Sequence, residues 1–152
     1  MMRALIACLP LLFGTPALAQ SVSECDWRAG AAVIAEPWPD NTRTYSNGKV
    51  RLAVLDTIEP AAAAFHLLVL SPPYSEVGDR QCRVVSLDGA LGFSGMDISK
   101  IESDYDPARG LMFTLPAGLY NPETGGSNWR QLSITLNQAT GQIITTLGDL
   151  AR

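Results

Sequence analysis

Alternation of apolar and polar side chains along residues 130–147 constrains the fold more than any other feature of this sequence. The segment reads RQLSITLNQATGQIITTL, and every second residue from Leu132 to Leu136 is apolar. A period of two places these side chains on one face of an extended chain, which is typical of a strand buried on one side. Residues 137–141 supply turn formers including a glycine, and residues 142–147 are rich in β-branched side chains. We therefore predict a β-hairpin here.

Other segments show strand patterns of the same kind. Asn47-Gly48 separates two short runs and favours the tight turn whose twist matches a pair of strands. Asp106-Pro107 starts a second turn, after which apolar residues alternate again. Residues 65–70 are apolar on both faces, as expected for a central strand covered on both sides, and we expect Pro72-Pro73 to end that strand. The predicted strands are 42–45, 50–55, 65–70, 82–87 and 111–115, in addition to the hairpin.

Helical patterns are short and few. Ser23-Glu24-Cys25-Asp26 resembles a capping box, and apolar residues follow at helical spacing, so we expect a short helix that Pro37 ends. Residues 61–64 and the residues after Asp97 are weaker candidates for one helical turn each. The fold class that these patterns predict is mainly β, an antiparallel sandwich or small partly open barrel with one or two short helices.

Residues 1–19 have the layout of a cleaved secretory signal peptide. Arg3 precedes an apolar run, and Ala17-Leu18-Ala19 offers small side chains where a signal peptidase cuts. We expect cleavage after Ala19, which leaves residues 20–152 as a single β-rich domain in the periplasm or outside the cell. The apolar run is too short to cross about 30 Å of hydrocarbon, and we expect no membrane span in the mature chain.

The cysteines support the same compartment. Removal of the leader takes away Cys8 and leaves an even pair, Cys25 and Cys82, where disulfides persist. We predict one bridge between them. Leu5-Ile6-Ala7-Cys8 resembles a lipoprotein cleavage box, but too few residues precede it for a basic region and an apolar helix. A metal or redox site is disfavoured because the chain has no C-x-x-C spacing and a single histidine.

Charge excludes several classes of partner. Loss of Arg3 with the leader changes the formal net charge from −4 to −5, and the remaining basic residues are scattered along the chain. Nucleic acids and anionic lipids bind to clustered positive charge, so we expect neither as a partner. The acidic residues between Asp97 and Asp106 do not match a calcium loop, since Leu115 stands where such a loop starting at Asp104 needs its last carboxylate. We expect no cofactor and no metal.

Catalytic motifs are incomplete. His66, the only histidine, falls on an apolar face, where a structural ring hydrogen-bonded to neighbouring backbone is the ordinary case. A hydrolase would use it as a general base for a nearby serine such as Ser71, Ser75 or Ser94. The segment Gly92-Phe93-Ser94-Gly95-Met96 approaches a nucleophile elbow, but Met96 replaces its second glycine. We therefore expect no catalysis.

Three large aromatic residues lie in or beside predicted loops, and they form the candidate binding surface. Trp38 stands between two prolines, Tyr74 follows Pro72-Pro73, and Trp129 lies next to a glycine-rich loop. Aromatic side chains on loops of a rigid sheet suit contact with an envelope protein or a glycan. The sequence thus indicates a noncatalytic exported binding domain. Two alternatives stay open: a small hydrolase using His66, and a proteinaceous inhibitor of an envelope enzyme.

Overall fold

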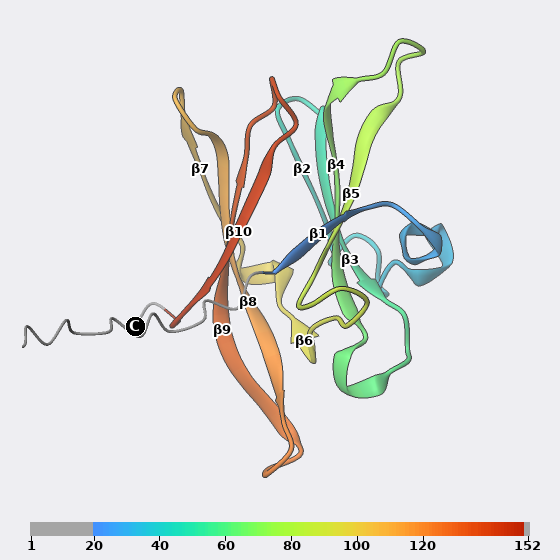
Figure 1. Ribbon diagram of the computed structural model, residues 1–152, viewed down its shortest axis with the longest axis vertical. Helices are drawn as coiled ribbons and strands as arrows, with labels where there is room; N and C mark the ends of the chain where they lie inside the picture. The colour runs from blue at the N-terminus through green and yellow to red at the C-terminus, as the bar shows by residue number, and fades with distance from the viewer. Residues whose placement is uncertain (1–19, 151–152) are drawn as a thin grey trace, which may run out of the picture.

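Two antiparallel sheets lie face to face in the computed structural model, which describes residues 20–150 (Figure 1). The first sheet has the strand order β1 (Ser21–Glu24), β5 (Arg80–Ser86), β4 (Phe65–Tyr74), β3 (Val50–Asp56), β2 (Thr42–Tyr45). The second has the order β10 (Ile143–Gly148), β9 (Gly126–Leu136), β8 (Gly110–Asn121), β6 (Gly95–Met96), and β7 (Glu102–Asp106) also pairs with β8. The predicted mainly β fold is confirmed, as a sandwich.

The core lies between the sheets, where the alternating residues of both inner faces meet. The predicted apolar faces of β3, β8 and β9 all point into it, as the sequence period requires. Burial of each large aliphatic side chain stabilises the fold by about 1.5–3 kcal/mol. The buried members are Val50, Leu52, Val54, Leu67, Val69, Val85, Phe93, Ile98, Leu111, Phe113, Leu115, Ala117, Leu132, Ile134 and Leu136.

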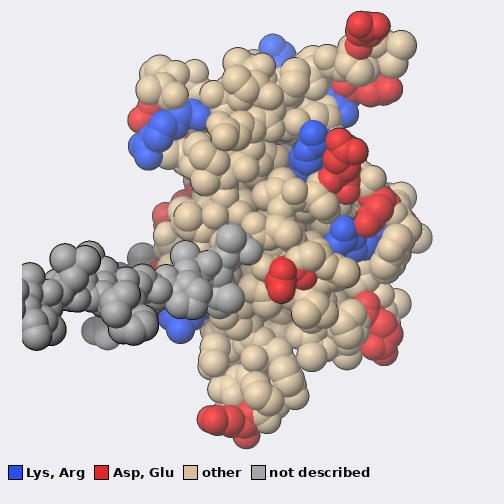
Figure 2. Space-filling model, in the orientation of Figure 1, with Lys and Arg blue, Asp and Glu red and all other residues tan. Residues whose placement is uncertain are grey.

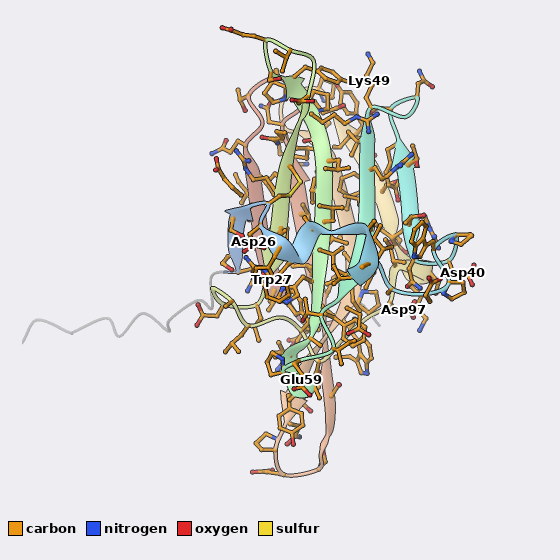
Figure 3. All side chains as sticks on the ribbon, turned by 90° about the vertical axis from the view of Figure 1, so that its right-hand side faces the viewer. Asp26, Trp27, Asp40, Lys49, Glu59 and Asp97 are labelled. Carbon is orange, nitrogen blue, oxygen red and sulfur yellow. A yellow bond between two sulfur atoms is a disulfide. The ribbon has the colours of Figure 1, made fainter. Side chains whose placement is uncertain are left out.

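A second, smaller core covers the outer face of the first sheet. There the segment after β1 crosses the strands, and Figure 3 shows Asp26 and Trp27 on this crossing segment. The predicted disulfide between Cys25 and Cys82 is confirmed and fastens the segment to β5. The buried residues beneath it are Ala53, Leu55, Leu68 and Val84. This cover explains why β4 is apolar on both faces.

The two predicted hairpins are confirmed. The hairpin of residues 130–147 forms β9 and β10, paired in register from Leu136 with Ile143 to Gln131 with Gly148. The turn between β2 and β3 places Ser46 and Asn47 at positive φ, the backbone conformation that the Asn-Gly sequence favours. The Asp106-Pro107 turn is also confirmed, since the Asp106 carboxylate accepts hydrogen bonds from the backbone N–H groups of Ala108 and Arg109.

The predicted helices are single 3-10 turns. The N-terminal one divides into Trp27–Ala29 and Ala31–Val33, and the others are Ala61–Ala63 and Ile98–Lys100. The capping box was wrong, because Ser23 and Glu24 belong to β1 and Asp26 is the residue that caps the first turn. Residues 21–24 form a strand and not a helix because they pair with the edge of β5 at four positions.

Several strand boundaries differ from the prediction, most of all the end of β4, and one strand was not predicted. Pro72-Pro73 does not end β4, which continues to Tyr74 through a register shift after Ser71, so that the prolines face no ladder partner. Residues 102–106, expected to be a loop or helix, form β7, which pairs with β8. The acidic side chains of β7 are mostly exposed, which an edge strand tolerates.

The predicted signal peptide, its cleavage site and Cys8 lie outside the described residues. Within residues 20–150, no helix has the length and hydropathy needed to cross a membrane.

Candidate functional site

A groove of about 460 Å³ opens on the outer face of the second sheet, the sheet face that the N-terminal segment does not cover. Thr114 and Pro116 of β8 and Trp129 and Gln131 of β9 form its floor. Three charged residues, two from the link between β6 and β7 and one at the start of β7, line one side, and Leu150, after β10, lines the other. Asp97, Lys100 and Glu102 are those charged residues. We call this site the Trp129 groove.

The indole of Trp129 lies across two neighbouring strands. Trp129 pairs with Gly118 of β8, and Gly118 pairs with Gly95 of β6, so one row of the sheet carries a single large side chain. A Cβ atom at Gly95 would lie 3.0 Å from Trp129 Cη2, which shows that the ring reaches this strand. Gly95 therefore leaves room for the indole, which remains 44% exposed.

Asp97 is held in its ionised form at the rim. Its carboxylate accepts hydrogen bonds from the backbone N–H of Ser99 at 3.1 Å and from Ser99 Oγ at 2.5 Å. Lys100 Nζ lies 3.1 Å from the other carboxylate oxygen. These hydrogen bonds, first that of the Ser99 hydroxyl, lower the pKa of Asp97 below its ordinary value of 3.8. Asp97 is therefore an acceptor at neutral pH and a poor proton donor.

A second aromatic residue shares the face of Trp129. Tyr120 of β8 pairs with Ser127, two positions along from the pair of Gly118 with Trp129, and both pairs point to the same side of the sheet. Tyr120 is 48% exposed. It lies on the β8–β9 hairpin, which projects beyond the rest of the sandwich at the bottom of Figure 1. The hairpin thus extends the exposed aromatic surface beyond the groove.

The other two predicted aromatic residues lie elsewhere. Trp38 precedes β2, at the end of the first sheet where Asn41 O accepts a hydrogen bond from Val54 N. Tyr74 pairs with Arg80, whose guanidinium donates to Gly48 O at the opposite end of that sheet. Both are about half exposed, but they do not form one surface with Trp129.

His66 takes part in a buried polar network. Its ring is 1% exposed, and Nδ1 lies 2.8 Å from Ser86 Oγ, so its partner is a side chain rather than the backbone group expected. Arg28 Nη1 donates to Ser86 Oγ, and Arg28 Nε and Nη2 donate to the Asp26 carboxylate. Burial first, and then the positive charge of Arg28, lower the pKa of His66. The ring is therefore neutral at pH 7, and the network ties the crossing segment to the first sheet.

The serines proposed as nucleophiles make other hydrogen bonds. Ser71 Oγ donates to Pro72 O and accepts from Gln81, and Ser75 Oγ accepts from Asp79 N. Ser94 Oγ lies 2.7 Å from Ser127 Oγ, beside the Trp129 row. The hydrogen bonds of these three serines thus do not join them to His66.

Charges and metal ligands give no second site in the described part of the chain. No group of three or more His, Cys, Asp or Glu side chains within residues 20–150 is placed to hold a metal ion. Lys and Arg side chains are dispersed among acidic ones on the face seen in Figure 2. This dispersion is unlike the clustered positive surface of a nucleic-acid-binding protein.

Comparison with known proteins returned no relative: no family model, no curated protein and no solved structure matches the chain. The assignment of a function therefore depends on the geometry of the site.

The sequence singles out one residue of the groove, Trp129, as a candidate binding residue and does not single out the others. Trp129 was predicted from its place beside a glycine-rich loop, but that placement was wrong: β8 runs to Asn121 and β9 begins at Gly126, so Trp129 lies within a strand. Gln131 lies two positions from Trp129 on β9, so the period of two could have placed it on the same face. Asp97 and Lys100 lie in the link after β6 and join the groove only because β6, β8 and β9 pair side by side, and that pairing order has no signature in the sequence.

Proposed function

We propose that this chain is a noncatalytic binding domain, exported to the periplasm or secreted, and that the Trp129 groove is its ligand site. The observation that carries the proposal is the half-exposed indole that reaches Gly95 of β6, with charged and amide side chains lining the same groove. Binding sites of this size pair an apolar surface with a few placed polar groups. This aromatic surface lies outside the core, and its exposure to water has a free-energy cost that ligand binding offsets.

The chemistry of the groove supports binding over catalysis. A glycosidase needs one carboxyl group with a raised pKa to protonate the leaving group, whereas hydrogen bonds lower the pKa of Asp97. The hydrolase alternative needs an accessible base, and His66 is enclosed by Arg28 and Ser86. No feature of the described residues separately favours an enzyme inhibitor, which inhibition assays against envelope enzymes distinguish.

Export is supported by the disulfide, which persists in oxidising compartments. The test is mass spectrometry of the protein recovered from the periplasm and medium of an expressing cell. We expect a chain that starts at Gln20 and contains no free thiol. An intact leader, or Cys25 and Cys82 both reduced, contradicts this part of the proposal.

The binding proposal is tested by NMR, with the indole N–H resonance of Trp129 as the reporter. This resonance is assigned by comparison with Trp129→Phe, and the protein is titrated with fractionated envelope peptides and glycans. We expect a ligand fraction that moves the Trp129 signal and leaves the Trp38 signal in place. Shifts confined to Trp38 or Tyr74 place the site elsewhere, and no shift in any fraction refutes the proposal.

A further inference from the structure

We infer that the Trp129 groove takes a neutral saccharide, one pyranose ring of which stacks on the indole of Trp129. This inference rests on the proposed binding function and narrows it to one class of ligand. It follows from the shape, the hydrogen-bonding groups and the charge of the groove.

The shape of the aromatic surface suits a sugar ring. A pyranose presents a broad face of C–H groups, and a flat indole offers a matching apolar face of large area. The far edge of the indole is packed against Gly95, and a surface held by the protein loses little conformational freedom when a ligand binds. The groove volume of about 460 Å³ falls in the range of small-molecule sites.

The polar groups around the indole include both donors and acceptors. Asp97 accepts, Lys100 donates, and Thr114 and Gln131 can do both. A sugar hydroxyl both donates and accepts, so adjacent hydroxyls can bond to such a mixed set, whereas a phosphate or a carboxylate only accepts. The ordered pair of Asp97 and Lys100 presents one partner of each kind, 3.1 Å apart, at the rim.

The charge of the groove disfavours anionic ligands. Two carboxylates, on Asp97 and Glu102, face one ammonium group, on Lys100, which leaves the rim with one net negative charge. A phosphorylated, sulfated or uronic sugar therefore meets repulsion there. We expect neutral sugars to bind more tightly than anionic sugars of the same size.

A peptide fits this site less well than a sugar does. Extended peptides bind to sheets mainly by adding a strand to a free edge. Thr114 and Gln131 of the groove floor are paired on both sides, Thr114 with Glu102 and Ser133, and Gln131 with Pro116 and Gly148, so their backbone groups are occupied. Residues 126–130 of β9 have no partner in β10, so the peptide arm of the experiment tests strand addition at that edge.

Tyr120 gives the inference a second feature. It lies on the same face as Trp129, further along the β8–β9 hairpin and outside the lining of the groove. Diagonal positions on one face of paired strands are about 7–8 Å apart, within reach of one extended ligand. An oligosaccharide bound over Trp129 can therefore contact Tyr120, whereas a monosaccharide cannot do both.

The experiment titrates the mature protein with glucose, N-acetylglucosamine and their β-linked oligomers, and with glucuronic acid and glucose 6-phosphate as anionic counterparts. Binding is followed by calorimetry and by the Trp129 indole resonance. We expect the neutral oligomers to bind and the anionic sugars to bind at least about threefold more weakly. Trp129→Ala should weaken binding about tenfold or more, and Trp38→Ala should leave it unchanged.

Two further variants test the geometry. Gly95→Ala adds a Cβ that would lie 3.0 Å from Trp129 Cη2, so it should displace the indole and weaken binding without removing any ligand contact. Tyr120→Ala should weaken binding of oligomers and leave monosaccharide binding unchanged. Thermal unfolding shows whether each variant is folded. If Trp129→Ala does not fold, Trp129→Phe, which keeps an aromatic ring, is used in its place.

The outcomes separate the two proposals. If a peptide or an anionic sugar moves the Trp129 resonance and no neutral saccharide does, the ligand class is wrong and the binding function stands. If neutral saccharides bind but Trp129→Ala and Gly95→Ala have no effect, the inferred site is wrong. If no probe of any class binds, both proposals fail.

Discussion

Removal of the bridge between Cys25 and Cys82 should lower the free energy of unfolding by about 4 kcal/mol. The two cysteines are 57 positions apart in the chain. In the chain-entropy model, closure of a loop of that length removes roughly 14 cal/mol/K from the unfolded chain, which gives the stated figure near room temperature. This is a large share of the roughly 5–15 kcal/mol that stabilises an ordinary domain.

The folded state should survive the loss. β1 stays paired with β5 at four positions, and Cys25 N donates to Cys82 O independently of the sulfur atoms. Arg28 also holds the crossing segment through Asp26 and Ser86. We therefore place the effect mainly in the unfolded chain, which becomes less restricted and exposes more surface.

The assay is equilibrium urea unfolding of the double variant Cys25→Ala with Cys82→Ala, beside the reduced wild-type protein. Reduction breaks the same bridge and keeps both side chains, so the two samples should agree within about 1 kcal/mol. Their slopes of free energy against urea should exceed that of the oxidised protein. A loss below about 1 kcal/mol with an unchanged slope would refute the entropic argument.

Three further changes probe the packing and the buried network, each followed by urea unfolding. Stability should fall as the pH drops below 6.5, because the pKa of His66 is lower in the folded protein and the unfolded chain therefore takes up the proton first. His66→Gln should remove this dependence of the unfolding free energy on pH above about pH 4.5. If the dependence is unchanged in the variant, other groups cause it. Gly92→Ala should cost more than about 2 kcal/mol, since its Cβ would lie 2.4 Å from a backbone oxygen, whereas Gly148→Ala, in open space, should cost little. Arg28→Met should cost roughly 3 kcal/mol because the buried guanidinium donates hydrogen bonds to Asp26, Ser86 and Ser23, whereas Arg109→Met, at an exposed ion pair, should change stability little. Equal effects of the two variants contradict the role of the network.

Much of the fold was predictable because its strongest signals are local. Alternation from Leu132 to Leu136 follows from burial of one face of a strand, and Asn47-Gly48 follows from a turn at positive φ, which most other residues disfavour. The disulfide followed from counting the cysteines that remain after Ala19. The strand and turn predictions depend on residues that are close in sequence, and the disulfide prediction depends only on the number of cysteines.

The errors fall where a distant partner decides the structure. Ser23 and Glu24 match a helix cap, but the free edge of β5 turns them into a strand. The partner of His66 is Ser86, twenty positions away in the chain, and only the pairing of β4 with β5 brings the two together. The groove likewise combines side chains from the link between β6 and β7, from β7, β8 and β9, and from the segment after β10, so that only Trp129, with Gln131 on the same strand face, could be singled out from sequence.

The covering of the first sheet by the N-terminal segment gives the molecule a front and a back. On the back, Leu55 and Leu68 are sealed beneath a strap that is joined to β5 by a covalent bond. On the front, the open face of β8 and β9 stays in contact with solvent, so anything that docks there meets a surface already in its final shape. The protein can therefore be attached to a support or a neighbouring protein through the covered face of the first sheet, and the open face of β8 and β9 stays accessible.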